Sequence, residues 1–177
     1  MPIQPDTKDW TWVLDKPCDE CGFEAAAFTR EQVGDMLRAN ASQWRSLLSH
    51  PKVGERPSDD RWSALEYACH VRDGIRLYDE RLRMMLEQDD PDYPNWDQDE
   101  ASVDYANEDP ARVADEIESA GAALADHFDA VGGEQWTRTG NRSDGARFTV
   151  ESFARYYIHD PIHHLKDVKQ GFARLGA

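Results

Sequence analysis

The sequence is short of positive charge. Lys and Arg number 20 among 177 residues, against 35 Asp and Glu, so the formal net charge is −15. Proteins that bind nucleic acid or an anionic membrane surface present basic patches to the phosphates. A strongly acidic chain without such a patch is therefore expected to bind neither.

Long apolar runs and a secretion signal are also missing. No stretch approaches the roughly 18 apolar residues that suggest a membrane-spanning helix. The N-terminus lacks a basic segment followed by an apolar run. Cysteine is scarce, with only Cys18, Cys21 and Cys69, and an odd number argues against a disulfide framework. Together these features predict a cytoplasmic protein.

The sequence has almost none of the apolar–polar alternation that marks a β-strand. Hydrophobic residues still make up 40% of it, with six Trp, six Tyr and six Phe to fill a core. Four segments have apolar positions at helical spacing. They start near Thr29, Asp60, Asp109 and Thr149 and end near His50, Gln88, Gly132 and Phe172. This pattern predicts one domain of all-α class, a four-helix bundle.

Two long segments lie outside these helices. Residues 1–28 contain helix-breaking prolines together with Trp10 and Trp12, which favour burial, so we expect an extended strap packed on a bundle of residues 29–177. Residues 89–110 are acidic and contain three prolines. A connection of this length is uncommon in a compact domain, and we expect it to cross over the bundle.

Histidines are concentrated in the last predicted helix. His159 and His163 are four residues apart, so they lie about 40° apart on one helical face, a spacing that lets two imidazoles bind one ion. His164 falls instead on the stripe that we expect to face the core. Catalytic zinc sites usually have a third protein ligand, and His70 in the second helix is the best candidate. A lone histidine within a helix is more often a hydrogen-bonded core residue.

Pro161 lies between these histidines and removes one helical hydrogen bond. Either the helix kinks at this point, or Asp160 caps a new helix that begins at Pro161. The second case would rotate His159 relative to His163. The apolar period continues across the proline, which favours the kink.

With these histidines placed, the sequence resembles the DinB/YfiT-like family of metalloenzymes. The resemblance rests on His70, on the spacing of His159 and His163, and on the segments PNWDQDE and HDPIHHLKDV, and it extends over about residues 29–172. It implies a bundle of up-down-down-up topology. It also implies a divalent metal, commonly zinc or nickel, with His70, His159 and His163 as ligands.

The resemblance further implies a reaction on a small-molecule substrate. Characterised relatives are thiol transferases that use low-molecular-weight thiols such as bacillithiol or mycothiol, or mycothiol-dependent maleylpyruvate isomerases. Many members have Gly-Gln after the last ligand, where this chain has Leu165 and Lys166. We therefore expect a metal-dependent thiol S-transferase. A metal-dependent hydrolase and a non-catalytic metal-binding or stress-response bundle are the alternatives, and homodimer formation is plausible.

Three residues are candidates for substrate binding, and no catalytic residue can be assigned beyond the ligands. Arg142 belongs to a cluster of three arginines before the last helix and could bind substrate carboxylates, although pairing with the acidic crossover is the simpler role. Trp96 and Tyr156 could line a pocket or merely fill the core.

Cys18 and Cys21 form a Cys-x-x-Cys pair, which suggests either a redox dithiol or half of a zinc knuckle. A structural zinc site needs four ligands, and the sequence has no second such pair. Neither role can be assigned from the sequence.

Overall fold

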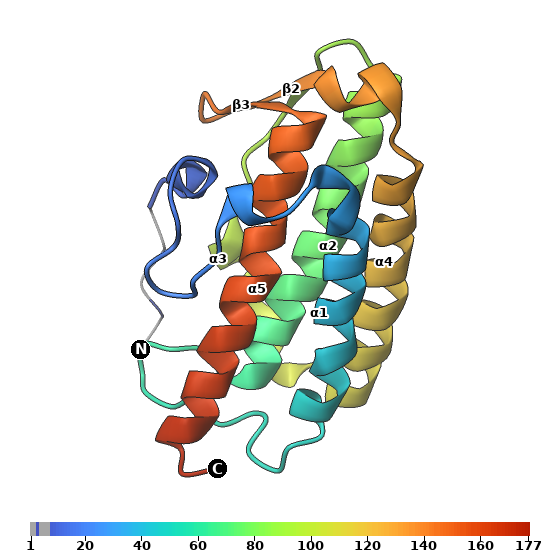
Figure 1. Cartoon of the computed structure of the whole chain (residues 1–177). Helices are drawn as coiled ribbons and strands as arrows, with labels where there is room; N and C mark the ends of the chain where they lie inside the picture. Colours follow the sequence, from blue (N-terminus) through green and yellow to red (C-terminus); the bar gives the residue numbers. More distant parts are fainter. Residues whose placement is uncertain (1–2, 4–7) are drawn as a thin grey trace.

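The computed structural model describes Ile3 and residues 8–177, and Pro2 and Pro5 of the predicted strap lie outside the described residues. Four long helices pack side by side (Figure 1): α1 (Val33–Leu48), α2 (Ala64–Glu87), α4 (Pro110–Ala130) and α5 (Val150–Arg174). Helices α2 and α4 run in one direction, and α1 and α5 run in the other (Figure 1). The predicted bundle with up-down-down-up topology is confirmed.

Capping residues set where the helices begin. Thr29 and Gln32 form a capping box at the predicted start of the first helix, although it caps a short 3-10 helix, η3 (Arg30–Gln32), that leads into α1. Asp109 and Thr149 cap α4 and α5 as expected. The second helix begins later than predicted, because Ser63 accepts a hydrogen bond from the backbone of Glu66.

Helix α5 continues without interruption through Pro161. The alternative of a new helix that begins at Pro161 is therefore wrong, and the continuous helix that the apolar period favoured is the one observed. Because the helix is continuous, residues 159 and 163 keep one face, and residues 160 and 164 keep another, about 100° around the axis.

The parallel direction of α2 and α4 requires the long crossover. This segment contains β1 (Asp92–Tyr93), α3 (Gln98–Ala101) and the 3-10 helix η4 (Ser102–Asn107). β1 pairs in parallel with β2 (Thr139–Arg142), which pairs antiparallel with β3 (Arg147–Thr149). Sequence analysis did not predict this small sheet, because its strands have only two to four residues and show little alternation.

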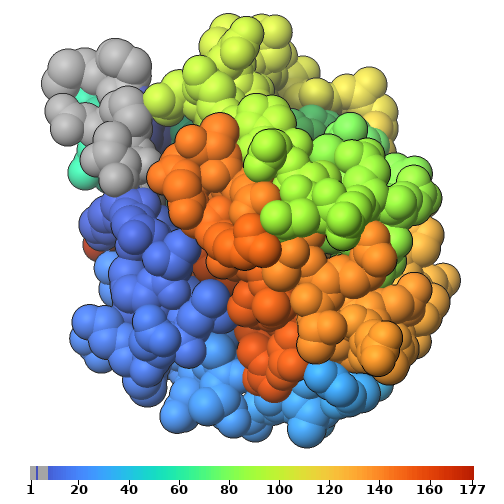
Figure 2. Space-filling model, turned by 90° about the horizontal axis from the view of Figure 1, so that it is seen from above, coloured from blue at the N-terminus to red at the C-terminus, as the bar shows by residue number. Residues whose placement is uncertain are grey.

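Residues 8–28 lie along α5 and contain two 3-10 helices, η1 (Thr11–Leu14) and η2 (Ala25–Ala27). From above, this segment covers one side of the bundle next to α5 (Figure 2). Val13, Cys18 and Phe23 are buried with the bundle core. Arg155 of α5 donates a hydrogen bond to the carbonyl of Phe28 at 2.7 Å, which holds the end of the segment.

A further pairing fixes the start of α2. Glu66 is 2% exposed and accepts hydrogen bonds from the guanidinium of Arg56 and from the backbone N–H of Ser63. Burial raises the pKa of Glu66, but the hydrogen bonds from Arg56 and Ser63 outweigh it, and the net shift is downward.

Glu66→Gln is expected to lower the free energy of unfolding by about 1–2 kcal/mol at neutral pH, because glutamine keeps the cap but loses the ion pair. The depressed folded-state pKa stabilises the protein above the unfolded value of about 4.3, and this contribution is lost as pH falls through the folded-state pKa. Urea denaturation between pH 7 and pH 3 should therefore show the two proteins converging in acid. A constant difference across this range would contradict the role of the charge.

Candidate metal centres

The two faces of α5 carry two separate clusters of potential metal ligands. His70, Asp160 and His164 form one, which we call the core cluster, and Cys18, Cys21, His159 and His163 form the other, the strap cluster. Within each cluster the ligand atoms all lie within 4.8 Å of one another. The described part of the chain yields these two groups of His, Cys, Asp and Glu and no further one.

The core cluster joins α2 to α5. Oδ1 of Asp160 lies 3.5 Å from Nε2 of His70 and 3.3 Å from Nε2 of His164. The two imidazole rings are 4.8 Å apart and perpendicular. His70 is buried, whereas the side chain of Asp160 is 35% exposed, so the cluster is open on one side. Two imidazoles and a carboxylate on one opening are a donor set typical of catalytic metal sites.

Neighbouring groups orient these donors. Nδ1 of His164 and Oδ2 of Asp167 are 3.0 Å apart, which leaves Nε2 of His164 directed to Asp160. Burial disfavours the charged form of His164, but Asp160 and Asp167 outweigh it and raise its pKa to about 10. Partial burial disfavours the charged form of Asp160, but His164 and His70 outweigh it and hold the pKa of Asp160 well below the usual range. A cation binding here would displace the proton of His164.

Trp96 of the crossover covers this cluster. Its ring stacks on His70, with centroids 4.8 Å apart and planes 14° from parallel, and Trp62 packs on the same imidazole at 5.4 Å. Nδ1 of His70 is buried and has no hydrogen-bond partner among the described residues. The nitrogen of His70 that faces Asp160 is Nε2, and the two imidazoles and one carboxylate of the core cluster are a donor set that fits a divalent metal ion.

The strap cluster joins residues 18–21 to the outer face of α5. Sγ of Cys18 lies 3.8 Å from Nδ1 of His163. Nε2 of His159 is buried and has no hydrogen-bond partner among the described residues. Burial lowers the pKa of His159 to about 4 and raises the pKa of Cys21 to about 11. The imidazole of His159 is therefore neutral at pH 7 and free to act as a ligand.

The expected grouping of His70 with His159 and His163 is not what the structure shows. His70 meets Asp160 and His164 in the core cluster, and His159 and His163 face the N-terminal segment. The spacing of four residues occurs twice in the segment HDPIHH, once for His159 and His163 and once for Asp160 and His164. The second pair is the one that meets His70. The placement of His164 on the core-facing stripe was the signal that pointed to this pair.

The predicted substrate-binding residues are also divided. Trp96 lies against the core cluster, as described. Arg142 is buried near the start of α5, where it pairs with Asp144 at 2.9 Å and donates a hydrogen bond to the hydroxyl of Tyr156 at 3.2 Å. Tyr156 precedes Asp160 by one helical turn, so it lies on the same face of α5 as the core cluster.

The other two arginines of the predicted basic cluster do not face either metal-ligand cluster. Arg147 pairs with Asp90 of the acidic crossover at 3.0 Å. Arg138 donates hydrogen bonds to the carbonyls of Met85 and Gln88 at the end of α2. Arg147 thus ties the crossover to the small sheet, which is the simpler role that the sequence left open, and Arg138 ties the residues before β2 to the end of α2.

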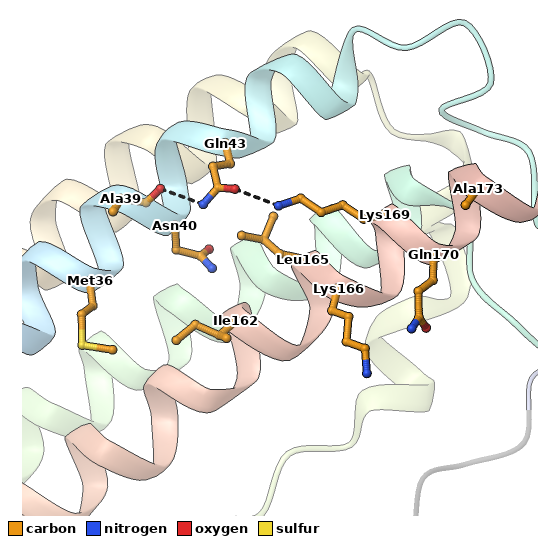
Figure 3. A pocket seen from close by; sticks show the side chains of 10 residues that line it. All are labelled: Met36, Ala39, Asn40, Gln43, Ile162, Leu165, Lys166, Lys169, Gln170 and Ala173. Atoms are coloured by element: carbon orange, nitrogen blue, oxygen red, sulfur yellow. Dashed lines mark hydrogen bonds between the residues drawn. The ribbon is translucent and has the colours of Figure 1, made fainter. Parts of the chain in front are cut away.

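An open groove of about 630 Å³ lies elsewhere, between α1 and α5 (Figure 3). Its floor includes Met36, Ile162 and Leu165, and its rim includes Lys166 and Lys169. Gln43 accepts a hydrogen bond from Lys169 at 3.1 Å across the groove (Figure 3). None of the lining residues belongs to either cluster.

A four-helix bundle with potential metal ligands on α2 and α5 is an arrangement found in helical-bundle metalloproteins. A family model of the DinB superfamily matches residues 34–168, and the chain belongs to this superfamily.

One solved structure with a similar fold is YfiT from Bacillus subtilis, which is described as a probable metal-dependent hydrolase with an unusual four-helix bundle topology. The TM-score is 0.73 and the identity 17%, over 83% of this chain and 86% of that chain. A comparison with curated proteins finds no match. In the described part of the chain, no helix combines the length and apolar character needed to cross a membrane.

Proposed function

We propose that the protein is a divalent-metal-dependent enzyme whose reaction centre is the core cluster. The observation that carries this proposal is the meeting of His70, Asp160 and His164 across α2 and α5, with Asp160 open to solvent. A divalent ion held there would polarise a substrate carbonyl or lower the pKa of a water or thiol. In this site His70 and His164 bind the ion, Asp160 balances its charge, and Asp167 fixes the ring of His164.

The substrate is expected to be small and anionic. Arg81 is 3% exposed, and its guanidinium stacks on Tyr93 at 4.7 Å and donates a hydrogen bond to the carbonyl of Pro94. Within residues 8–177, its Nε has no hydrogen-bond partner and it forms no ion pair with a carboxylate. The guanidinium also stacks on Tyr78, and Arg81 lies eleven residues, about 16 Å, from His70 along α2. A buried cation without a carboxylate partner is unfavourable, so Arg81 could bind an anionic group at the far end of a substrate held at the core cluster.

Hydrolysis is the reaction that the donor set favours. Two histidines and one carboxylate are also the ligands of known zinc hydrolases, and YfiT is described as a probable metal-dependent hydrolase. Trp96 and Trp62 exclude solvent from one side of His70 and leave the side of Asp160 for substrate and water.

Thiol S-transfer is the second candidate, and the observation that favours it is Arg81, whose Nε has no hydrogen-bond partner among the described residues. Bacillithiol and mycothiol are polar molecules with carboxylate or amide groups, and the carboxylate of such a thiol could bind Arg81. The same metal ligands would suit this reaction, because a bound divalent ion lowers the pKa of a thiol as it lowers the pKa of a water molecule.

Activity with and without added thiol separates the two reactions. We expect the zinc- or nickel-loaded protein to cleave small anionic esters or amides without thiol, and His70→Ala to lower kcat/KM by about 1000-fold or more, since the metal is lost. Turnover of an electrophilic dye only with bacillithiol or mycothiol would favour the transferase. Metal binding without turnover in either assay would contradict both and leave a non-catalytic bundle.

A further inference from the structure

The strap cluster has the composition of a zinc site that the reaction does not use. It contains two thiols and two imidazoles, the set that favours tetrahedral zinc. Bond lengths of about 2.3 Å to sulfur and 2.0 Å to nitrogen place a tetrahedral N···S edge near 3.5 Å. The 3.8 Å between Sγ of Cys18 and Nδ1 of His163 is within reach of this value after a small contraction.

The backbone around the cysteines has the form that binds a metal. The N–H of Gly22 donates to the carbonyl of Cys18 at 2.7 Å, and the N–H of Cys18 donates to the carbonyl of Phe23 at 2.8 Å. Gly22 has a φ of 75°, a conformation that side chains disfavour, and it turns the chain directly after Cys21. This tight turn brings both sulfur atoms to the same side, facing α5.

The two imidazoles of the strap cluster are also held in place by neighbouring side chains. Oε2 of Glu20 lies 3.4 Å from Nε2 of His163, so a proton on this nitrogen would leave Nδ1 free for the metal. Trp10 packs on both imidazoles, at 5.5 Å from His159 and 5.3 Å from His163, and Phe23 packs on His159 at 5.2 Å. Two thiolates would also neutralise a divalent ion, which suits this apolar enclosure.

We propose that Cys18, Cys21, His159 and His163 bind one zinc ion that fastens the N-terminal segment to α5. The site is closed, because four protein donors complete the tetrahedron and aromatic rings cover it, so its role is structural. The zinc joins residues 18 and 21 to a helix about 140 positions further along the chain. It thereby positions α5, which carries Asp160 and His164 on its other face.

Metal content of the purified full-length protein, kept reduced, tests the site. We expect two equivalents of divalent metal in the wild type, one in Cys18→Ser/Cys21→Ser and one in His70→Ala. Cys69→Ser is the matched control, because Cys69 is a buried cysteine outside the cluster, and it should keep two. A double cysteine variant with the full wild-type content would overturn the proposal. If the proposed function is wrong, His70→Ala should instead contain as much metal as the wild type, because no ion then depends on His70.

Cobalt substitution shows which atoms bind. Cobalt-loaded wild type, His70→Ala and Cys69→Ser should display a thiolate-to-cobalt charge-transfer band in the near ultraviolet, and Cys18→Ser/Cys21→Ser and His163→Ala should lose it. Should the variants fail to fold, alkylation of the wild-type chain decides: Cys21 should react only after a chelator removes the metal. A disulfide between Cys18 and Cys21 in reduced, zinc-supplemented protein, or alkylation of Cys21 that zinc does not slow, would contradict zinc binding and favour a redox dithiol.

Discussion

Asp160→Asn is expected to weaken metal binding at the core cluster by about 100-fold or more. The substitution keeps the shape of the side chain but removes the only negative charge among the three donors, whereas loss of an outer partner alone typically costs 10–100-fold. Titration against a chromophoric chelator measures the change. A Cys18→Ser/Cys21→Ser background leaves the core cluster as the only expected binding site.

Asp104→Asn is the matched control, since it removes the same charge from an exposed position of the crossover. It should bind metal as the parent does. His159→Ala, in the same background, should also leave this affinity unchanged. Loss of the metal in His159→Ala together with retention in Asp160→Asn would restore the grouping of His70, His159 and His163 and refute the core cluster as the metal site.

Trp44→Ala is expected to lower the free energy of unfolding by about 3–5 kcal/mol, one of the largest effects that a single substitution can have. Trp44 is fully buried in α1, and its indole N–H donates to Oδ1 of Asn40 at 3.1 Å. The substitution leaves a cavity in the core and removes the partner of a buried amide. Urea denaturation followed by circular dichroism measures the loss.

Val103→Ala provides the comparison, because Val103 is 76% exposed on η4 and its truncation should change stability by no more than about 0.5 kcal/mol. Equal, small effects of the two substitutions would mean that the core around Trp44 relaxes to fill the space. The contrast between them therefore tests the packing of the bundle and not merely the presence of α1.

The helices were accessible to sequence analysis because their signals are local. Thr29 with Gln32, and Thr149 with Ser152, satisfy backbone N–H groups within one turn, and Asp109 accepts from the backbone N–H of Arg112. The chain therefore needs no distant partner to begin a helix at these positions. The small sheet was not accessible, because β1 and β2 are separated by more than forty residues and neither strand is long enough to show a pattern.

The candidate site was predictable only in part. His70 and another helix with potential ligands four residues apart were identified from the sequence, and in the structure His70 meets a pair with this spacing. Rotation of α5 about its axis decides which pair of donors meets His70, and that rotation depends on packing against α2 through residues such as Tyr157, which stacks on Tyr78 at 4.3 Å. The apolar period within α5 places His164 on the core-facing stripe, but it does not show which residue of another helix that stripe meets.

The sequence by itself determined the class of fold, the positions of the helices and the residue types able to bind a metal, because capping and helical periodicity act over a few residues. Only the tertiary structure decided how those residues combine. The tertiary structure brings Asp160 and His164 to His70, and it brings His159 and His163 to Cys18 and Cys21. A side chain on a helix meets partners from other segments only when those segments pack against the face on which it lies.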